Sequence, residues 1–265
     1  MPFLELDDLR FLTFASFNAS ELTHAVFTRR GGASRGHFSA LNVGGTVGDN
    51  PADVVENRRR AFRSVARPFD SLYDVWQVHG VEVVCTEAPR SPDAPHCQAD
   101  AILTSSPRVT LFMRFADCVP ILLYDPQRRV VGLVHAGWQG TVQRTAAAAI
   151  QSMQSQYGCQ PADILAGIGP SIGAHHYPVG PEVIAQVRQA FGPDAATLLS
   201  VPNGNQQTGV QFDLWAANRL VLEQAGLRQI EIAGICTACH LDDWYSHRAE
   251  SGRTGRFGAL IGLNG

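Results

Sequence analysis

Three segments of the sequence each place a side chain that can bind a metal at the end of a strand-like run. These side chains are His79, Cys118 and His135. Strand ends can bring side chains together at a cleft, because there the rigid scaffold gives way to exposed loop. One Cys and two His would leave the fourth position of a zinc ion open, as in catalytic rather than structural sites. Their spacings of 39 and 17 residues match no local metal-binding pattern, so simple packing of these side chains remains an alternative.

The elements that must position these side chains can be predicted from capping residues and apolar runs. Asn50 with Pro51, and Asp213, are typical of helix starts, and Gly158 and Gly226 of helix ends. The expected helices are residues 52–65, 141–156, 181–190 and 214–224. The expected strands are residues 82–86, 109–115, 121–124, 130–135, 164–168 and 230–235. Because the strands form groups with few helices between them, the pattern favours an α+β fold with mixed sheets over a doubly wound parallel sheet.

The composition limits the classes of protein to which this chain can belong. The 265 residues, 45% of them hydrophobic, contain no linker or repeat, so we expect a single domain over residues 1–265. The net charge of −3 gives no basic excess for nucleic acid. All 21 cationic side chains are Arg, which excludes a Walker-A phosphate loop or a Lys Schiff base.

Location and assembly are inferred from missing signals. No apolar run approaches the roughly 20 residues of a membrane helix, and residues 1–10 lack the positive flank of a signal peptide. We therefore expect a cytoplasmic protein without membrane contact. No coiled-coil pattern is present, so we expect a monomer or a small homo-oligomer.

The six Cys are too sparse for a disulfide framework in a chain of this length. Cys236 and Cys239 form a C-x-x-C-H pattern with His240. This pattern is compatible with covalent haem or a redox pair, but simple packing of Cys236 at a strand end is favoured.

Several short motifs follow one another in the order of a known family. They are Thr28-Arg29-Arg30-Gly31-Gly32-Ala33-Ser34, Ser39-Ala40-Leu41-Asn42, Gln77-Val78-His79-Gly80, Ala116-Asp117-Cys118-Val119-Pro120, His135-Ala136-Gly137-Trp138, Gly167-Ile168-Gly169-Pro170 and Thr254-Gly255-Arg256. Together they resemble the laccase-domain family, also called the multicopper polyphenol oxidase, purine nucleoside phosphorylase or peptidoglycan editing factor family. The resemblance runs from about residue 24 to the C-terminus.

The resemblance implies a single-domain α+β fold with layered mixed sheets flanked by helices. It implies zinc bound by His79, Cys118 and His135, which copper can displace because of its higher affinity. It also implies phosphorolysis of purine nucleosides (adenosine, inosine, guanosine and methylthioadenosine) and deamination of adenosine. Arg29 and Asn42 would lie in the pocket.

The resemblance also covers a segment near the C-terminus, Trp244-Tyr245-Ser246-His247-Arg248, where His247 stands in a position that is commonly aromatic. In a metal-assisted phosphorolysis, Arg29 and Arg248 would hold phosphate. Asp117 or Asn42 would act as the donor to the leaving purine. The alternatives are a surface salt bridge for Arg29 and a carboxylate that orients a metal ligand for Asp117.

Three rival functions use the same residues. A copper laccase needs about ten His in H-x-H pairs, and the chain has nine His and no such pair, which disfavours it. A cysteine hydrolase would use Cys118 as nucleophile, His135 or His79 as base, and the amides of Gly137 and Trp138 as oxyanion hole. That chemistry fits editing of a cytoplasmic peptidoglycan precursor by amide hydrolysis. A binding protein without catalysis is the third rival.

Overall fold

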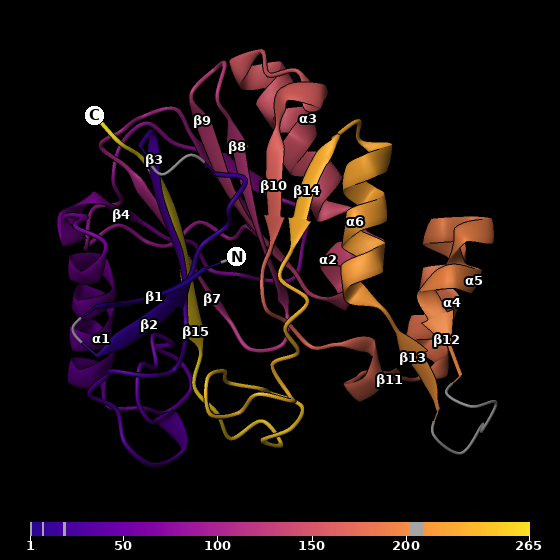
Figure 1. The fold of residues 1–265 in the computed structure, drawn as a ribbon, viewed down its shortest axis with the longest axis horizontal. Coiled ribbons are helices and arrows are strands. Elements are labelled where there is room, and N and C mark those ends of the chain that lie inside the picture. The colour runs from indigo at the N-terminus through magenta and orange to yellow at the C-terminus, as the bar shows by residue number, and fades with distance from the viewer. Residues whose placement is uncertain (1, 7, 18–19, 202–208) are drawn as a thin grey trace.

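Two six-stranded β-sheets stacked face to face form the centre of the fold, with helices on both outer sides (Figure 1). The computed structural model describes residues 2–6, 8–17, 20–201 and 209–265. This arrangement confirms the predicted α+β class with mixed sheets flanked by helices. No helix in these described ranges is long and apolar enough to cross a membrane.

The first sheet carries both ends of the chain. Its strands in spatial order are β1 (Phe3–Leu6), β2 (Leu9–Leu12), β3 (Leu22–Phe27), β15 (Phe257–Leu263), β7 (Thr110–Phe115) and β4 (Leu72–Tyr73). Neighbours pair antiparallel except for β4 and β7, which run parallel. Of these six, only β7 was expected from its sequence.

The second sheet holds most of the predicted strands. Its spatial order is β14 (Gln229–Ile232), β10 (Leu165–Ile168), β8 (Val119–Asp125), β9 (Val130–Ala136), β6 (Ala101–Thr104) and β5 (Val83–Cys85). The outer pairs at both edges are parallel, and the inner pairs are antiparallel. A small third sheet contains β11 (Pro178–Val179), β13 (Val210–Phe212) and β12 (Leu199–Ser200).

Side-chain caps define two of the main helices as predicted. The helices are α1 (Pro51–Ser64), α2 (Trp138–Val142), α3 (Thr145–Tyr157), α4 (Pro181–Phe191), α5 (Ala195–Leu198) and α6 (Leu214–Gln224). Short 3-10 turns span Gly36–Phe38, Phe69–Ser71, Pro161–Asp163, Ala174–His176 and Gly192–Asp194. Asn50 accepts a bond from the second residue of α1, and Asp213 accepts one from the third residue of α6, both at 2.9 Å.

The expected single helix over residues 141–156 is wrong in detail, since two helices occupy this region. Arg144 adopts a left-handed backbone with φ of 63°, which ends α2 and starts α3 in a new direction. The hydroxyl of Thr145 donates to the carbonyl of Gly80 at 2.7 Å. This contact ties the start of α3 to the loop that carries His79.

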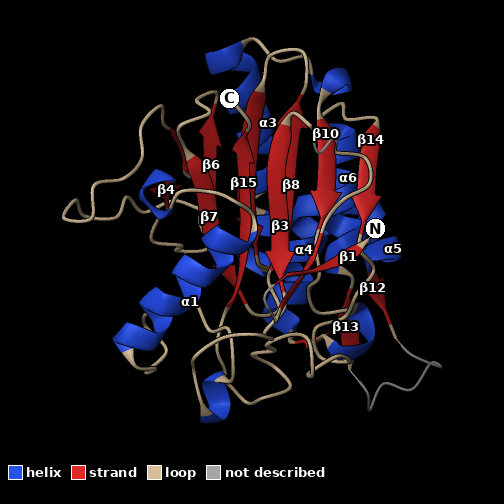
Figure 2. Ribbon diagram, turned by 60° about the vertical axis from the view of Figure 1, so that its left-hand side comes forward, coloured by secondary structure: helices blue, strands red, loops and turns tan. Residues whose placement is uncertain are grey.

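Apolar side chains fill three spaces between the four layers. Along β8, Ile121 and Leu123 face the helices α3 and α6, whereas Leu122 and Tyr124 face the first sheet. The strand reads as a continuous apolar run because both of its faces are covered. On the far side of the first sheet, a third cluster with Phe62 packs beneath α1. Figure 2 shows α1 on the near side of the strands and α3 and α6 on the far side.

Candidate active site

The three sequence-predicted metal ligands meet at one end of the second sheet. Cys118 immediately precedes β8, and His135 lies in β9, which pairs with β8 so that Pro120 stands opposite His135. His79 comes from the loop before β5. The ligand atoms of the three side chains all lie within 4.8 Å of one another, and Cys118 Sγ is 3.8 Å from His79 Nε2. The pairing of β8 with β9, together with the loop before β5, thus brings together three residues that are 39 and 17 positions apart in the sequence.

Asp100, just before β6, holds two of these ligands in place. Its Oδ1 lies 2.7 Å from Nδ1 of His135, which directs Nε2 toward the cluster. Its Oδ2 accepts bonds from the backbone N–H groups of Val78 at 3.1 Å and Gly80 at 2.7 Å, on either side of His79. Burial disfavours the Asp100 carboxylate, but these bonds together keep its pKa below the usual value. Sequence reasoning missed this residue, whose one signal was a carboxylate directly before a buried strand.

Two backbone features shape the surroundings of the ligand cluster: the left-handed conformation of His79 and the absence of a side chain at Gly137. His79 adopts a left-handed backbone with φ of 60°, which the two bonds to Asp100 support. A Cβ on Gly137, the N-cap of α2, would lie 3.0 Å from Cys118 Sγ and 3.0 Å from a ring carbon of His79. Gly137 therefore allows the close approach of these side chains, and its backbone angle is not unusual.

The charge state of the cluster favours a thiolate. Burial opposes ionisation of Cys118, but His135 and His79 outweigh it and lower the pKa of the thiol to about 6. Burial would also lower the pKa of His135, yet Cys118 and Asp100 raise it to about 9. Without metal, these two shifts favour the thiolate and imidazolium forms of the pair. The thiolate is the form of Cys that binds metals and acts as a nucleophile.

These residues fit a metal ion. Two imidazoles and a thiolate stand within ligand distance of a common point, and Asp100 orients His135 as carboxylates orient metal-bound His in other proteins. The three side chains line a cavity, so a fourth coordination position would face it. Three protein ligands with one open position are typical of catalytic zinc.

The adjoining cavity has a volume of about 450 Å³, enough for a nucleoside-sized molecule. Its walls combine aromatic, cationic and small residues from both sheets. They are Gly44, Thr46, Trp76, Gln77, His79, Arg114, Ala116, Asp117, Cys118, His135, Tyr177, His247, Arg248 and Arg256.

Two of the three cavity arginines form no ion pair within the described ranges, although the Asp117 carboxylate lines the same cavity. Arg114 is paired with the buried Asp74, so its charge is compensated. Arg256 donates to the carbonyls of Thr254 and Gly255, and Arg248 donates to that of Pro178. Within the described ranges, no ion pair involves Arg248 or Arg256. Two guanidinium groups without an ion pair at one cavity could bind an anion such as phosphate through charge-assisted hydrogen bonds. Arg256 stands in a motif noted in the sequence but had been assigned no role.

Arg29 and Asn42, two expected pocket residues, do not line the cavity. The guanidinium of Arg29 pairs with Glu250 at 3.1 Å, donates to the carbonyls of Ser39 and Leu241, and stacks on Tyr245. Asn42 is fully buried, and its Oδ1 accepts bonds from Gly44 at 2.9 Å and Arg256 at 2.8 Å. Both contribute to the cavity indirectly, since Asn42 fixes the backbone from which Arg256 extends.

Asp117 and Arg248 are both at the cavity and bonded to each other. Asp117 Oδ2 accepts the backbone N–H of Arg248 at 2.7 Å, and its Oδ1 accepts the Thr237 hydroxyl at 2.6 Å. Both side-chain oxygens of Asp117 are thus engaged as acceptors. Neither bond reaches a metal ligand, so the orienting role considered for Asp117 belongs to Asp100.

A layered α+β fold, in which one Cys and two His that could hold a metal ion open onto a cavity, defines the class of this protein: an α+β protein with an enzyme-like pocket. The family model described as multi-copper polyphenol oxidoreductase laccase matches residues 23–264. The chain belongs to this family.

Relatives extend the match over nearly the whole chain. A purine nucleoside phosphorylase of Deinococcus radiodurans is 38% identical over 240 residues, which are 91% of this chain and 88% of that protein. The purine nucleoside phosphorylase YlmD of Bacillus subtilis (strain 168) is 36% identical over 258 residues, covering 93% and 90%. The crystal structure of YlmD from Geobacillus stearothermophilus superposes with a TM-score of 0.90 at 33% identity, covering 99% and 98%.

Proposed function

We propose that the protein is a zinc-dependent purine nucleoside phosphorylase that acts on adenosine, inosine, guanosine and methylthioadenosine. The observation that carries this proposal is the location, on one cavity, of three side chains that could hold a metal ion and of two arginines without an ion pair. The names of the relatives from D. radiodurans and B. subtilis support it.

His79, Cys118 and His135 would hold the zinc. Bound there, zinc would supply Lewis acidity to an oxygen of phosphate or water, tempered by the thiolate. Arg248 and Arg256 would bind the phosphate through charge-assisted hydrogen bonds and fix its orientation. Arg29, held in its own network away from the cavity, would support the wall instead of the phosphate.

In phosphorolysis, a phosphate oxygen forms a bond to C1′ of the ribose while the bond from C1′ to the purine nitrogen breaks. The electron pair of that bond leaves with the purine, which then takes up a proton. Positive charge develops on the ribose, and the Asp117 carboxylate at the cavity is placed to stabilise it electrostatically. This role replaces proton donation by Asp117.

The purine would lie against Trp76 and Tyr177, whose aromatic faces line the cavity. His247 also lines it, and its side chain forms no hydrogen bond within the described part of the chain. We assign proton delivery to the leaving purine to His247, because the other candidate, Asn42, is buried behind the wall.

The test is phosphate-dependent release of adenine from adenosine by the zinc-loaded protein, with Arg256→Gln compared to Arg253→Gln. Arg253 is exposed and contacts His37 away from the cavity, so it is a matched control. Loss of one charged hydrogen-bonding partner is worth about 1.5–3 kcal/mol, so the KM for phosphate should rise roughly 10- to 100-fold in Arg256→Gln alone. Equal effects in both variants would contradict the phosphate role of Arg256. Inosine formed without phosphate would report the adenosine deaminase activity that we include in the proposal.

One observation favours a second candidate, a cysteine-dependent amide hydrolase that edits a peptidoglycan precursor. Cys118, His135 and Asp100 stand in the order of nucleophile, base and orienting carboxylate, with the thiolate already favoured. Removal of zinc separates the two candidates. A phosphorylase loses its activity with the metal, whereas a cysteine hydrolase that acts on an amide substrate retains or gains activity.

A further inference from the structure

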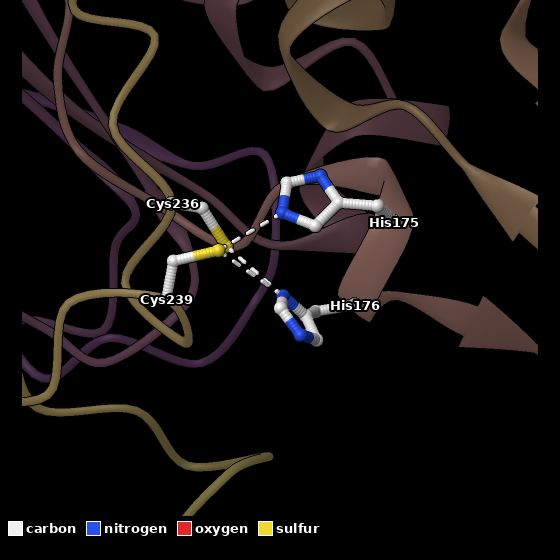
Figure 3. Close-up of side chains that lie close together, drawn as sticks. All are labelled: His175, His176, Cys236 and Cys239. Atoms are coloured by element: carbon white, nitrogen blue, oxygen red, sulfur yellow. Dashed lines mark hydrogen bonds between the residues drawn. The ribbon is translucent and has the colours of Figure 1, made fainter.

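A second group of metal-ligating side chains lies outside the cavity. It consists of His175, His176, Cys236 and Cys239, and we call it the loop cluster. All four ligand atoms lie within 4.8 Å of one another. Figure 3 shows ring nitrogens of the two His directed toward the sulfurs. The proposed phosphorylase chemistry does not use this cluster.

The topology brings these two pairs of residues together. The strands β10 and β14 are parallel neighbours, so the loops that follow them emerge from the same end of the sheet (Figure 1). Ser171 and Cys236 extend that pairing by one further bridge. The first loop then leads into the turn Ala174–His176, and the second forms the Cys236–Cys239 turn, closed by a backbone bond of 3.2 Å.

Two of three sulfur–nitrogen distances in the loop cluster agree with tetrahedral metal coordination, and the third is shorter. With zinc–sulfur and zinc–nitrogen bonds of about 2.3 and 2.05 Å, a tetrahedral site separates sulfur from nitrogen by roughly 3.6 Å. His176 Nδ1 lies 3.6 Å from Cys236 Sγ and 3.5 Å from Cys239 Sγ, and His175 Nε2 lies 3.1 Å from Cys239 Sγ. The two neighbouring His can share one site because each uses a different ring nitrogen.

Supporting contacts also suit a metal site. The backbone N–H of Gly173 donates to Cys236 Sγ at 3.2 Å, which stabilises a thiolate. A Cβ on Gly173 would lie 2.7 Å from the His175 ring and 3.3 Å from Cys236, so a larger residue there would displace the His175 ring from its present position. Cys236 is buried, and the other three ligands are exposed, which gives an ion a route of entry.

We propose that the loop cluster binds a second zinc ion with a structural role. Four protein ligands leave no position open for substrate, in contrast to the three-ligand cluster at the cavity. Two thiolates with two imidazoles select zinc over harder cations such as Mg²⁺ or Ca²⁺. The site therefore supplies no chemistry, and it cross-links the loops after β10 and β14.

This cross-link supports the wall of the cavity. Tyr177 follows His176 directly and lines the cavity. Thr237, inside the Cys236–Cys239 turn, donates to Asp117 at 2.6 Å, and Asp117 in turn precedes the metal ligand Cys118. Loss of the second zinc should therefore loosen the contacts of Asp117 and Tyr177 without removing the first zinc.

The experiment measures zinc per chain by elemental mass spectrometry in the full-length protein purified with zinc. We expect about two zinc ions in the native protein, about one in Cys239→Ser and about one in Cys118→Ser. His175→Ala, a change at an exposed side chain, provides a milder second test if Cys239→Ser folds poorly. Cys85→Ser is the matched control, because Cys85 is an exposed thiol outside both clusters.

Cobalt substitution gives an independent measurement. Co²⁺ in the native protein should show thiolate-to-metal absorption, and Cys239→Ser and Cys118→Ser should each remove a different part of it. A native protein with a single zinc that persists in Cys239→Ser would overturn the proposal, as would a disulfide between Cys236 and Cys239 found by peptide mapping. None of these results depends on turnover of a nucleoside, so failure of the second site and failure of the proposed function are distinguishable.

Discussion

At the scale of single residues, the cavity cluster depends on a carboxylate that is not itself a ligand. Asp100 touches His135 through one oxygen and the backbone around His79 through the other. Each bond fixes one ligand in the orientation that a metal requires, so the cluster is assembled before any metal arrives. Such preorganisation raises metal affinity.

Asp100→Asn should weaken zinc binding at the cavity cluster by about 10- to 100-fold. Asn has a single acceptor oxygen, so it cannot accept both from the N–H groups of Val78 and Gly80 and from His135 Nδ1–H, and the negative charge beside His135 is lost. Competition with a fluorescent zinc chelator measures the affinity. Asp93→Asn, an identical change at an exposed loop position, should leave it unchanged. Equal affinities in the two variants would remove Asp100 from the metal site.

At the scale of elements, α2 begins where it does because Gly137 leaves space for the cluster. The φ and ψ of Gly137, −70° and −177°, are accessible to any residue. The only constraint on a side chain at this position is therefore the space beside Cys118 and His79. Gly180 caps α4 in a similar extended conformation, with φ of −80°, but a Cβ there would meet nothing within 4 Å.

Gly137→Ala should therefore lower zinc occupancy at the cavity, whereas Gly180→Ala should not. The added methyl group stands against Cys118 and the His79 ring, and the ring must move to accept it. The change of N-cap residue itself has the same small effect at both sites. Zinc content per chain, with the melting temperature as a measure of folding, checks the prediction. Full occupancy in Gly137→Ala would show that the His79 loop adapts freely.

A buried imidazole in β3 makes the first sheet sensitive to acid. Nε2 of His24 accepts the backbone N–H of Phe14 at 2.8 Å, and the ring lies among Phe14 and Phe17. Burial lowers the pKa of His24 to about 4, although Glu231 acts in the opposite direction. The unfolded chain binds a proton near pH 6.5, so the unfolded state gains protons first as the pH falls.

The free energy of unfolding should decrease between pH 6.5 and 4 because of His24. Relative to pH 7, the contribution at pH 5 is about 2 kcal/mol less stability. His24→Gln keeps an acceptor for Phe14 but cannot titrate, so urea unfolding of this variant should show a smaller loss over the same interval. Identical losses in the native protein and the variant would show that other groups carry the acid sensitivity.

At the scale of the whole molecule, stability comes from apolar layers on both faces of the second sheet. Ile121 and Leu122 are neighbours in β8 and both fully buried, but they point to opposite sides. A strand of an open, half-exposed sheet would have only one such side.

Ile121→Ala and Leu122→Ala should each reduce the free energy of unfolding by about 2–5 kcal/mol, since each leaves a cavity in a different core. Leu4→Ala, at a side chain that is 47% exposed in β1, should change it by less than about 1 kcal/mol. Urea unfolding of the three variants measures these differences. A small effect for either buried residue would show that its face of the sheet is not packed as described.

Local patterns in the sequence predicted the starts of α1 and α6, the fold class and the three candidate ligands at the cavity. Asn50 and Asp213 act on residues within three positions of themselves, so no tertiary information is needed to predict the caps of α1 and α6. The His, Cys and His at the cavity could be predicted because few residue types bind metals and because all three follow or end strand-like runs. Family resemblance added the expectation that all three bind one ion.

Only the tertiary structure decided which distant residues meet. The strand β15 contains Gly258 and Gly262, which weaken any strand signal, and a Cβ on Gly258 would lie 2.7 Å from Phe112 across the sheet. Its pairing with β3 and β7 joins segments separated by more than a hundred residues. The same is true of Arg256 at the cavity and of the loop cluster. No local sequence pattern predicts where either of them lies, because their positions depend on the order of strands in the sheets and not on neighbours along the chain.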